Sequence, residues 1–402
     1  MTARNGDSAH VRTHERAALV GLVHGEARRL DADASLDELA GLVEAARAEP
    51  VLRFVQERAR PDPGTFIGSG KLETLRHACD TSDVDLVVFD NELTPAQLRN
   101  VERVLERRVI DRTQLILDIF ARRARTREGK LQVELAQLRY LLPRLVGASA
   151  ALSRLGGGIG TRGPGETKLE TDRRRIRQRI RSLDVELTAV RERRGRLRAR
   201  RRRADVPVVA LVGYTNAGKT TLFNRLTQGS AVASDALFVT LDPLMRELRL
   251  PNRQQARLTD TVGFIDRLPH ALVAAFRATL EEVSDADLLL HVVDASRDDY
   301  EQQMRAVDAV LEEVEATEVP SVVVFNKIDR LDPPVVTRLE GAYPRARVIS
   351  AATGQGIDLL LETIAAALAL DTRRLTLTFD QREAGDRAAI ARLSSSSSPT
   401  TS

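Results

Sequence analysis

The sequence predicts an α/β protein in which a doubly wound, mostly parallel sheet follows a small α/β domain and a long antiparallel helical hairpin. Apolar runs alternate with helix-like stretches in residues 17–112 and again in residues 206–370, as is typical of parallel sheets covered by helices. Between them, residues 113–205 carry two apolar stripes at helical spacing. Residues 1–16 and the short segment 371–402 have neither pattern, and we expect both to be largely disordered.

Length and composition narrow the class of protein. The chain has 402 residues, 43% of them hydrophobic, which suffices for two or three domains with their own cores. The single cysteine excludes an intramolecular disulfide. The first residues lack the apolar core of a signal peptide, and no apolar run of membrane-spanning length follows. We therefore expect a cytoplasmic protein without a membrane span. Separately, we expect a monomer, although the sequence does not determine the oligomeric state.

The first domain alternates strand-like runs with helix-like stretches. The strands are expected at ALVGLV, VLRFV, VDLVVF and RRVID, and the helices at SLDELAGLVEAAR and TPAQLRNVERVLER. GSGK, residues 68–71, looks like part of a phosphate-binding loop, but it lacks the four-residue spacing and the hydroxyl after lysine. We interpret it as a tight turn into the helix LETLRHA.

The two stripes predict the arms of the hairpin. The first comprises Leu131, Leu135, Leu138, Leu142 and Leu145, and the second comprises Ile176, Ile180, Leu183, Leu187, Val190 and Leu197. The glycine-rich stretch RLGGGIGTRGPGETKLE joins them and forms the tip. Each arm has roughly 34 to 38 residues and extends about 50 Å. We expect Pro143 to kink or end the first arm, and Thr167 with Glu170 to cap the second.

The charge of the chain is concentrated on the second arm. The formal net charge is only +4, yet the segment from Arg173 to Arg203 holds 15 arginines against three acidic residues. That segment therefore carries +12 and the remainder −8. Such a concentration favours a polyanionic partner, although a solvated helix face stays open as the alternative.

The last domain begins with a phosphate-binding motif. GYTNAGKT, Gly213 to Thr220, follows the apolar run VVALV and precedes the helix TLFNRL, as the G-x-x-x-x-G-K-[ST] pattern requires. Its backbone N–H groups are expected to cradle phosphates, with Lys219 on the β- and γ-phosphates and Thr220 on Mg²⁺. Lysine is rare here, with five among 61 basic residues, and Lys219 and Lys327 both fall in nucleotide motifs.

A second motif determines which nucleotide base the site binds. NKID, Asn326 to Asp329, directly follows the strand VPSVVVF. The Asp329 carboxylate can accept from the ring N–H and the exocyclic amine of guanine, whereas adenine lacks that pair of donors. The motif therefore favours GTP over ATP. Ser350 and Ala351, after RARVI, are placed to contact the guanine oxygen.

The segment between these motifs supplies the expected catalytic groups. Asp260, in DTVG, can hold Mg²⁺ through water, and the Gly263 N–H can sense the γ-phosphate. Thr240, in FVTLDP, is the expected switch threonine over Mg²⁺ and the γ-phosphate. Lys219, Thr240 and Gly263 are thus predicted to be catalytic, and Thr220, Thr240 and Asp260 to bind the metal. The predicted nucleotide-binding residues are Gly213, Tyr214, Thr215, Asn216, Ala217, Gly218, Lys219, Thr220, Thr221, Phe238, Val239, Thr240, Asp260, Thr261, Val262, Gly263, Asn326, Lys327, Asp329, Ser350 and Ala351.

These motifs together resemble a known family. GYTNAGKT, LFVTLDP, DTVGFI and NKID, preceded by FDNELTPAQLRN and GGGIGTRGPGETKLETDRRRI, are similar to the HflX family of ribosome-associated translation-factor GTPases. The resemblance covers roughly residues 17–368. It implies an N-terminal domain that binds the large ribosomal subunit, a hairpin tip close to ribosomal RNA, and GTP hydrolysis coupled to rescue or splitting of ribosomes under stress.

With that resemblance, the glycine-rich tip is expected to approach the RNA backbone. The predicted RNA-binding residues are Arg162, Lys168, Arg173, Arg174, Arg175 and Arg177. A merely flexible connector is the alternative for the tip.

Two residues of the nucleotide motifs bear on how GTP is hydrolysed. Phe264 follows DTVG at the position where many small GTPases place a glutamine that orients the attacking water. Asn216 could help coordinate a monovalent cation near the phosphates.

Two rival functions remain at this point. A nucleotide-stabilised RNA-binding protein with incidental turnover is the first, but Thr240 and Asp260 favour a hydrolytic switch. An ATP-driven RNA remodeller is the second, and it is disfavoured by NKID and by the absence of a second motor domain in the sequence. The sequence thus predicts a Mg²⁺-dependent GTPase that associates with ribosomes.

Overall fold

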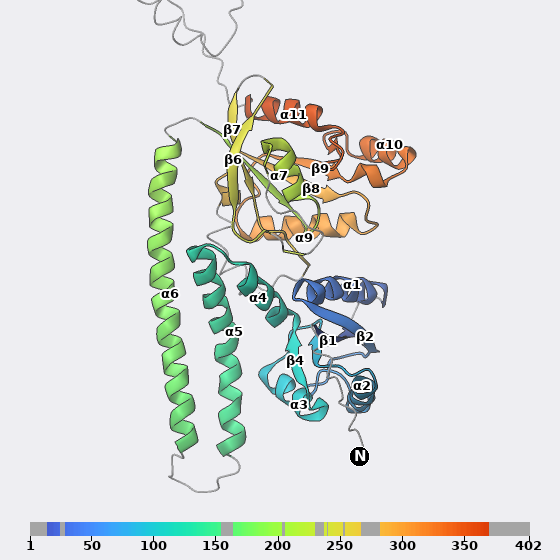
Figure 1. Ribbon diagram of the computed structural model, residues 1–402, viewed down its shortest axis with the longest axis vertical. Coiled ribbons are helices and arrows are strands. Elements are labelled where there is room, and N and C mark those ends of the chain that lie inside the picture. The colour runs from blue at the N-terminus through green and yellow to red at the C-terminus, as the bar shows by residue number, and fades with distance from the viewer. Residues whose placement is uncertain are drawn as a thin grey trace, which may run out of the picture.

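The computed structural model describes residues 14–24, 29–153, 164–202, 206–229, 237–238, 240–251, 254–266 and 282–369. Two α/β bodies lie one above the other, and a helical hairpin runs along one side of both (Figure 1). The terminal segments predicted to be disordered lie outside the described residues, except that the first strand already begins at Glu15.

The first body is a four-stranded parallel sheet in the order β2-β1-β3-β4. Its strands are β1 (Glu15–Val23), β2 (Ala48–Glu57), β3 (Leu86–Phe89) and β4 (Arg108–Asp111). The helices are α1 (Arg29–Ala45), α2 (Ser69–Thr81), α3 (Pro95–Leu105) and α4 (Arg112–Arg123). Side chains of α1 and α4 pack on one face, and those of α2 and α3 pack on the other. Both faces are covered, which explains the continuous apolar strands.

The GSGK stretch leads into a helix, as predicted, but the helix already begins at Ser69, where a tight turn was expected. Gly68 lies at the N-cap of α2 with an extended backbone, and Ser69 is the first helical residue. The Lys71 ammonium lies 4.4 Å from the centroid of the Phe54 ring. Lys71 therefore takes part in a cation–π contact within the first body.

The predicted antiparallel hairpin is present, formed by α5 (Arg127–Ser153) and α6 (Pro164–Arg202). Its buried seam is made by Leu131 and Leu135 from α5 with Leu183 and Leu187 from α6. Ion pairs flank this seam: Arg179 donates to both Glu134 oxygens at 2.6 and 2.8 Å, and Arg139 donates to Asp184 at 2.9 Å. The leucine stripes are thus packing residues, and charged pairs align the arms.

Three details of the hairpin differ from the prediction. The first arm is shorter, because the chain leaves helical geometry at Ala124 and α4 stands apart from α5. Of the two outcomes expected for Pro143, a kink or an end, the end is wrong: its exposed ring costs one backbone hydrogen bond, and the helix continues to Ser153. Thr167 is not a cap, because α6 already begins at Pro164, and proline suits a first helical turn. The glycine-rich residues 154–163 lie outside the described part.

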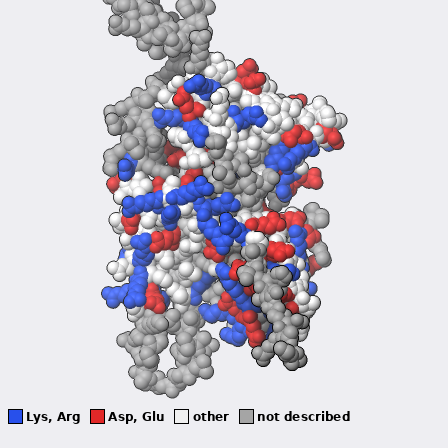
Figure 2. All heavy atoms as spheres, in the orientation of Figure 1, with Lys and Arg blue, Asp and Glu red and all other residues white. Residues whose placement is uncertain are grey.

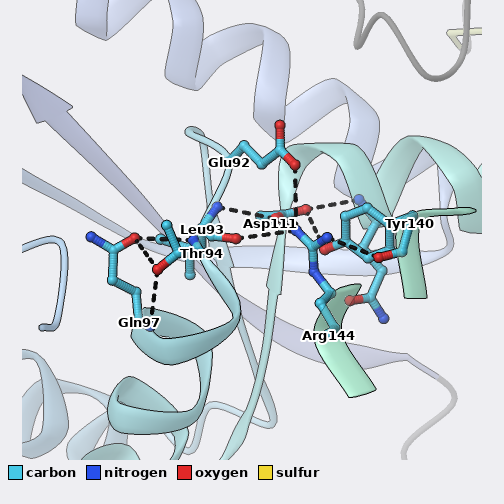
Figure 3. A network of polar contacts seen from close by, with 8 residues as sticks. Glu92, Leu93, Thr94, Gln97, Asp111, Tyr140 and Arg144 are labelled. Carbon is cyan, nitrogen blue, oxygen red and sulfur yellow. Dashed lines mark hydrogen bonds and ion pairs between the residues drawn. The ribbon is translucent and has the colours of Figure 1, made fainter. Parts of the chain in front are cut away.

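A polar network joins the hairpin to the first body (Figure 3). The fully buried Asp111, at the end of β4, accepts hydrogen bonds from the Tyr140 hydroxyl at 2.8 Å and from Arg144 at 3.0 Å, both on α5. It also accepts from the backbone of Leu93 and of Gln114. The Arg144 guanidinium stacks on the Tyr140 ring at 3.3 Å. These hydrogen bonds stabilise the buried Asp111 carboxylate, so the middle of α5 is fixed on the first body.

The second body is a six-stranded sheet in the order β10-β9-β8-β5-β7-β6, in which β6 runs antiparallel to β7. Its strands are β5 (Val208–Gly213), β6 (Leu244–Arg249), β7 (Gln255–Asp260), β8 (Leu288–Asp294), β9 (Ser321–Asn326) and β10 (Arg347–Val348). The helices are α7 (Lys219–Thr227), α9 (Tyr300–Glu313), α10 (Pro333–Ala342) and α11 (Ile357–Ala369), with a 3₁₀ turn at Ile328–Arg330.

Helices cover both faces of this second sheet. Residues of α7 and α11 pack on one face, and residues of α9 and α10 pack on the other, which confirms the doubly wound arrangement. One buried apolar cluster continues from Leu39 of α1 and Ile116 of α4 to Phe264 and to Val307 of α9. The two bodies therefore share a core.

Candidate nucleotide-binding site

A cavity of about 300 Å³ opens at the carboxyl ends of the central strands of the second sheet. This is where open parallel sheets bind their ligands. It is lined by Thr215, Asn216, Gly218, Lys219, Thr220, Thr221, Phe238, Thr240, Thr261, Gly263, Asn326, Lys327, Asp329, Arg330, Ala351 and Ala352. The three predicted nucleotide motifs thus meet around one space.

The loop between β5 and α7 has the geometry of a phosphate cradle. Gly218 has a φ of +91°, and a Cβ there would meet Asn326 Nδ2 at 2.2 Å, so only glycine fits. The buried Lys219 ammonium donates to the carbonyls of Gly213 and Tyr214 at 2.9 and 2.7 Å. Burial lowers the pKa of Lys219 to about 8, although the negative charge of Asp260 acts in the opposite direction and raises it. This ammonium lies in a low-dielectric site where a phosphate anion would stabilise it.

Oxygen atoms from three segments converge beside Lys219. Asp260 Oδ2 accepts from the Thr220 hydroxyl at 2.8 Å and from the Thr240 hydroxyl at 3.1 Å, and the two hydroxyls lie 2.9 Å apart. Asp260 Oδ1 is buried without a hydrogen-bond partner among the described residues. Burial raises the pKa of Asp260. A bound cation would pair with the free Oδ1 atom and would offset the cost of burying the negative charge of Asp260.

This set of oxygens fits Mg²⁺. Mg²⁺ prefers oxygen ligands and takes only one or two carboxylates, completing its shell with water and phosphate. The described residues contain no cluster of three His, Cys, Asp or Glu side chains that could hold a metal alone. Thr220, Thr240 and Asp260 would therefore hold the ion together with a bound nucleotide.

The base-recognition segment is cross-linked to the phosphate loop. Asn326 donates through Nδ2 to the Ala217 carbonyl and accepts through Oδ1 from the Ala351 N–H, both at 2.9 Å. Asp329 Oδ1 accepts from the Ser350 hydroxyl at 2.5 Å. Asn326 thus joins the phosphate loop to the Ala351 segment, and Ser350 holds the Asp329 carboxylate at the cavity, where a guanine edge could meet it.

Family models match along most of the chain. Residues 33–121 match the model described as GTP-binding GTPase N-terminal, residues 123–201 the GTP-binding GTPase Middle Region, and residues 208–327 the 50S ribosome-binding GTPase. The chain is 50% identical over 371 residues to the GTPase HflX of Lacrimispora saccharolytica, covering 92% of this chain and 87% of that protein. It is 47% identical to the GTPase HflX of Escherichia coli, covering 92% and 86%.

The chain belongs to the HflX family of GTPases. A GTP-binding protein from Sulfolobus solfataricus, solved with GDP, is 25% identical and has a TM-score of 0.46, covering 89% of this chain and 99% of that one. As an HflX protein the chain is a GTP-hydrolysing enzyme with a P-loop GTPase domain, as predicted. Within the described part of the chain, every helix is too short or too polar to span a lipid bilayer.

Several predicted site residues of this HflX chain do not reach the cavity. Gly213, Ala217, Asp260 and Ser350 stand behind it and act through the bonds described above. The side chains of Tyr214 and Val262 are buried in the shared core instead, because both bodies contribute apolar surface there. Val239 lies outside the described residues.

Phe264 is also placed away from the cavity. Its ring is buried in the shared core, its N–H donates to the Gly213 carbonyl at 3.1 Å, and its carbonyl accepts from the Thr215 N–H at 2.7 Å. The residue after DTVG therefore extends the pairing of β5 and lends no polar group to a water in the site.

Sequence reasoning missed several residues at the HflX site. Arg225, on α7, donates through Nε to the Ala351 carbonyl at 3.1 Å and also to the Ala352 carbonyl, so it supports the loop beside the base. Asp294, at the end of β8, pairs with the predicted Lys327 at 2.7 Å. Arg330 lines the cavity. No motif spacing signals Arg225 or Asp294, because their partners come from distant segments.

The predicted RNA-binding arginines lie on α6. Arg174, Arg175 and Arg177 are exposed, whereas Arg173 is partly buried and donates to Glu170 at 3.2 Å. Figure 2 shows Lys and Arg side chains along the left edge of the molecule, where Figure 1 places α6. Arg162 lies outside the described residues, and the side chain of Lys168 is not described.

Proposed function

We propose that this GTPase requires Mg²⁺, binds the large ribosomal subunit in the cytoplasm, and couples GTP hydrolysis to ribosome rescue, splitting or stress regulation of translation. The observation that carries the Mg²⁺-dependent switch is the convergence of Thr240 and Thr220 on Asp260. Thr240 comes from the loop before β6, Thr220 from the first turn of α7, and Asp260 from the end of β7. A loop threonine that lies beside metal-binding groups can hold its loop in place while the γ-phosphate is present and release it after hydrolysis.

Each group of the site has a role in the proposed reaction. The phosphate-loop N–H groups and Lys219 stabilise charge on the β- and γ-phosphates, and the Gly263 N–H contacts the γ-phosphate. Thr220, Thr240 and Asp260 hold Mg²⁺, which neutralises developing charge when bound. Asp329 selects guanine, with Ser350 and Ala351 beside the base.

The ribosomal partner is supported by the hairpin and by the description of the family model. The 50S ribosome-binding GTPase model matches residues 208–327. Exposed arginines on α6, including Arg174, Arg175 and Arg177, can neutralise RNA phosphates. The ion pairs and the Asp111 network fix this basic helix on the rest of the chain.

Co-sedimentation with purified subunits tests the proposal. The protein is incubated with large or small ribosomal subunits in GTP, GDP or a non-hydrolysable GTP analogue, and the pelleted fraction is measured. We expect pelleting with large subunits, strongest with the analogue. No pelleting in any nucleotide state contradicts the ribosomal partner. Equal pelleting in all states supports instead a nucleotide-stabilised RNA-binding protein with incidental turnover.

A further inference from the structure

The switch loop of the site is bonded to the base of the hairpin through Asp242. This residue follows Thr240 by two positions and does not line the nucleotide cavity. It accepts from the backbone N–H groups of Arg125 and Thr126 at 2.9 Å each and from the Thr126 hydroxyl. The same hydroxyl accepts from the Gly129 N–H at 3.0 Å in the first turn of α5. One carboxylate thus satisfies three donors at the start of the hairpin.

Gly129 makes room for this contact. A Cβ at position 129 would meet Asp242 Oδ1 at 2.5 Å, closer than real Cβ atoms approach an oxygen. Glycine inside a helix costs about 1 kcal/mol relative to alanine, so helix formation does not explain why position 129 is glycine. The close approach of the Asp242 carboxylate explains it.

A second anchor lies on the other side of Thr240. The Phe238 ring is buried and packs edge-on against Phe120 of α4, with ring centroids 4.7 Å apart. Phe238 also has a φ of +56°, a strained conformation for a bulky residue that only firm packing sustains. Thr240 therefore sits between an anchor on α4 and an anchor on the segment that directly precedes α5, while its hydroxyl reaches Thr220 and Asp260.

We propose that Asp242 is a positioning residue for GTP hydrolysis, which holds Thr240 on the metal-binding oxygens and makes its position depend on the base of the hairpin. The proposal rests on the proposed role of Thr240. Because Asp242 is bonded to the two residues that directly precede α5, a shift of that segment relative to the second sheet draws Thr240 from Thr220 and Asp260. A partner that engages the hairpin then acts on hydrolysis through this contact.

The test uses two variants that disturb the contact from opposite sides. Asp242→Asn replaces one acceptor oxygen with a donor, and Gly129→Ala forces the carboxylate away. Gly70→Ala is the matched control, because Gly70 lies in the first turn of α2 and its Cβ would meet nothing within 4 Å. Asp332→Asn is the control for the carboxylate, since Asp332 is exposed and makes no side-chain cap bond at the start of α10.

Turnover, Mg²⁺ dependence and GDP affinity are measured for each variant in the full chain. We expect both test variants to lower kcat by about tenfold or more and to require more Mg²⁺ for half-maximal rate. GDP affinity, which does not use Thr240, stays within about twofold, as do all properties of the controls. Both test variants keeping wild-type kcat and Mg²⁺ dependence overturns the inference.

Thr240→Ala is measured in parallel. Full activity of Thr240→Ala removes the proposed role of Thr240 itself. Loss of activity in Thr240→Ala together with normal activity in Asp242→Asn and Gly129→Ala overturns only the role of Asp242. If one test variant does not fold, as judged by circular dichroism, the other decides.

Discussion

Tyr214, in the phosphate loop, donates its phenolic hydrogen to the carboxylate of Glu38 on α1 of the first body. The same hydroxyl accepts from the Asp266 N–H at 2.7 Å, just beyond the DTVG segment. Glu38 in turn pairs with the buried Arg112, which donates to Asp90 at 2.8 Å. Burial raises the pKa of Glu38. A chain of polar contacts therefore connects the nucleotide site to the first body.

Removing the Tyr214 hydroxyl leaves the buried carboxylate of Glu38 with one hydrogen-bond donor fewer. We expect Tyr214→Phe to lower the free energy of unfolding by about 2 kcal/mol, because hydrogen bonds to charged groups contribute about 1.5–3 kcal/mol. Urea unfolding followed by circular dichroism measures the change. Tyr300→Phe is the control, since its hydroxyl lies 3.5 Å from an exposed Glu301 carboxylate. An equal effect of the two substitutions contradicts the assigned importance of the contact.

The Tyr214 contact also shows where sequence reasoning stops. The nucleotide motifs were predictable because each is a short segment whose place after a strand fixes its geometry. The Tyr214 partner was not, since Glu38 lies 176 positions earlier and no spacing signals it. The break between α4 and α5 depends likewise on Asp242, which reaches the turn from the other body. Contacts between bodies arise from the shared core, which a local pattern does not encode.

Guanine selectivity is expected to depend on Asp329. Asp329→Asn presents an amide donor where the carboxylate accepted, so the site should lose GTP affinity and gain affinity for xanthosine triphosphate, whose base carries an oxygen in place of the amine. Titration of both nucleotides measures the exchange. Asp332→Asn, exposed on the same segment, should bind GTP normally. Unchanged GTP affinity in Asp329→Asn removes the assignment.

The arginines of α6 are expected to contact RNA electrostatically. Reversing Arg173, Arg174 and Arg175 to glutamate should weaken pelleting with large subunits and flatten its dependence on salt, because fewer counterions are released. GTP affinity of the free protein should not change. Reversal of the exposed Arg338 and Arg345 on the second body is the control. Pelleting that survives the triple reversal at moderate salt excludes this stretch as the RNA contact.

The lowered pKa of Lys219 predicts how GTP affinity depends on pH. In the free protein this pKa is about 8, and a bound phosphate anion raises it, so binding takes up a proton where free Lys219 is neutral. Affinity should be nearly constant from about pH 7 to 8 and fall as pH rises above 8, by up to about tenfold per pH unit. Nucleotide phosphates are already ionised there and add no dependence.

Calorimetry in two buffers of different ionisation enthalpy measures this proton directly. We expect uptake close to zero at pH 7 and close to one proton at pH 9. Lys219→Met should show no uptake at either pH. Uptake that is equal at both values in the unaltered protein contradicts the lowered pKa.

We propose that the large ribosomal subunit activates GTP hydrolysis by this HflX protein. With the Phe264 ring buried and its backbone groups paired, the residue after DTVG cannot orient a water, so the isolated protein should bind GTP and hydrolyse it slowly. The decisive measurement is GTP turnover alone and with purified large subunits, in potassium and then in sodium. We expect stimulation by large subunits of at least about tenfold, and faster turnover in potassium if Asn216 helps hold a cation. Fast turnover of the isolated protein in both salts, without stimulation by subunits, would contradict the claim.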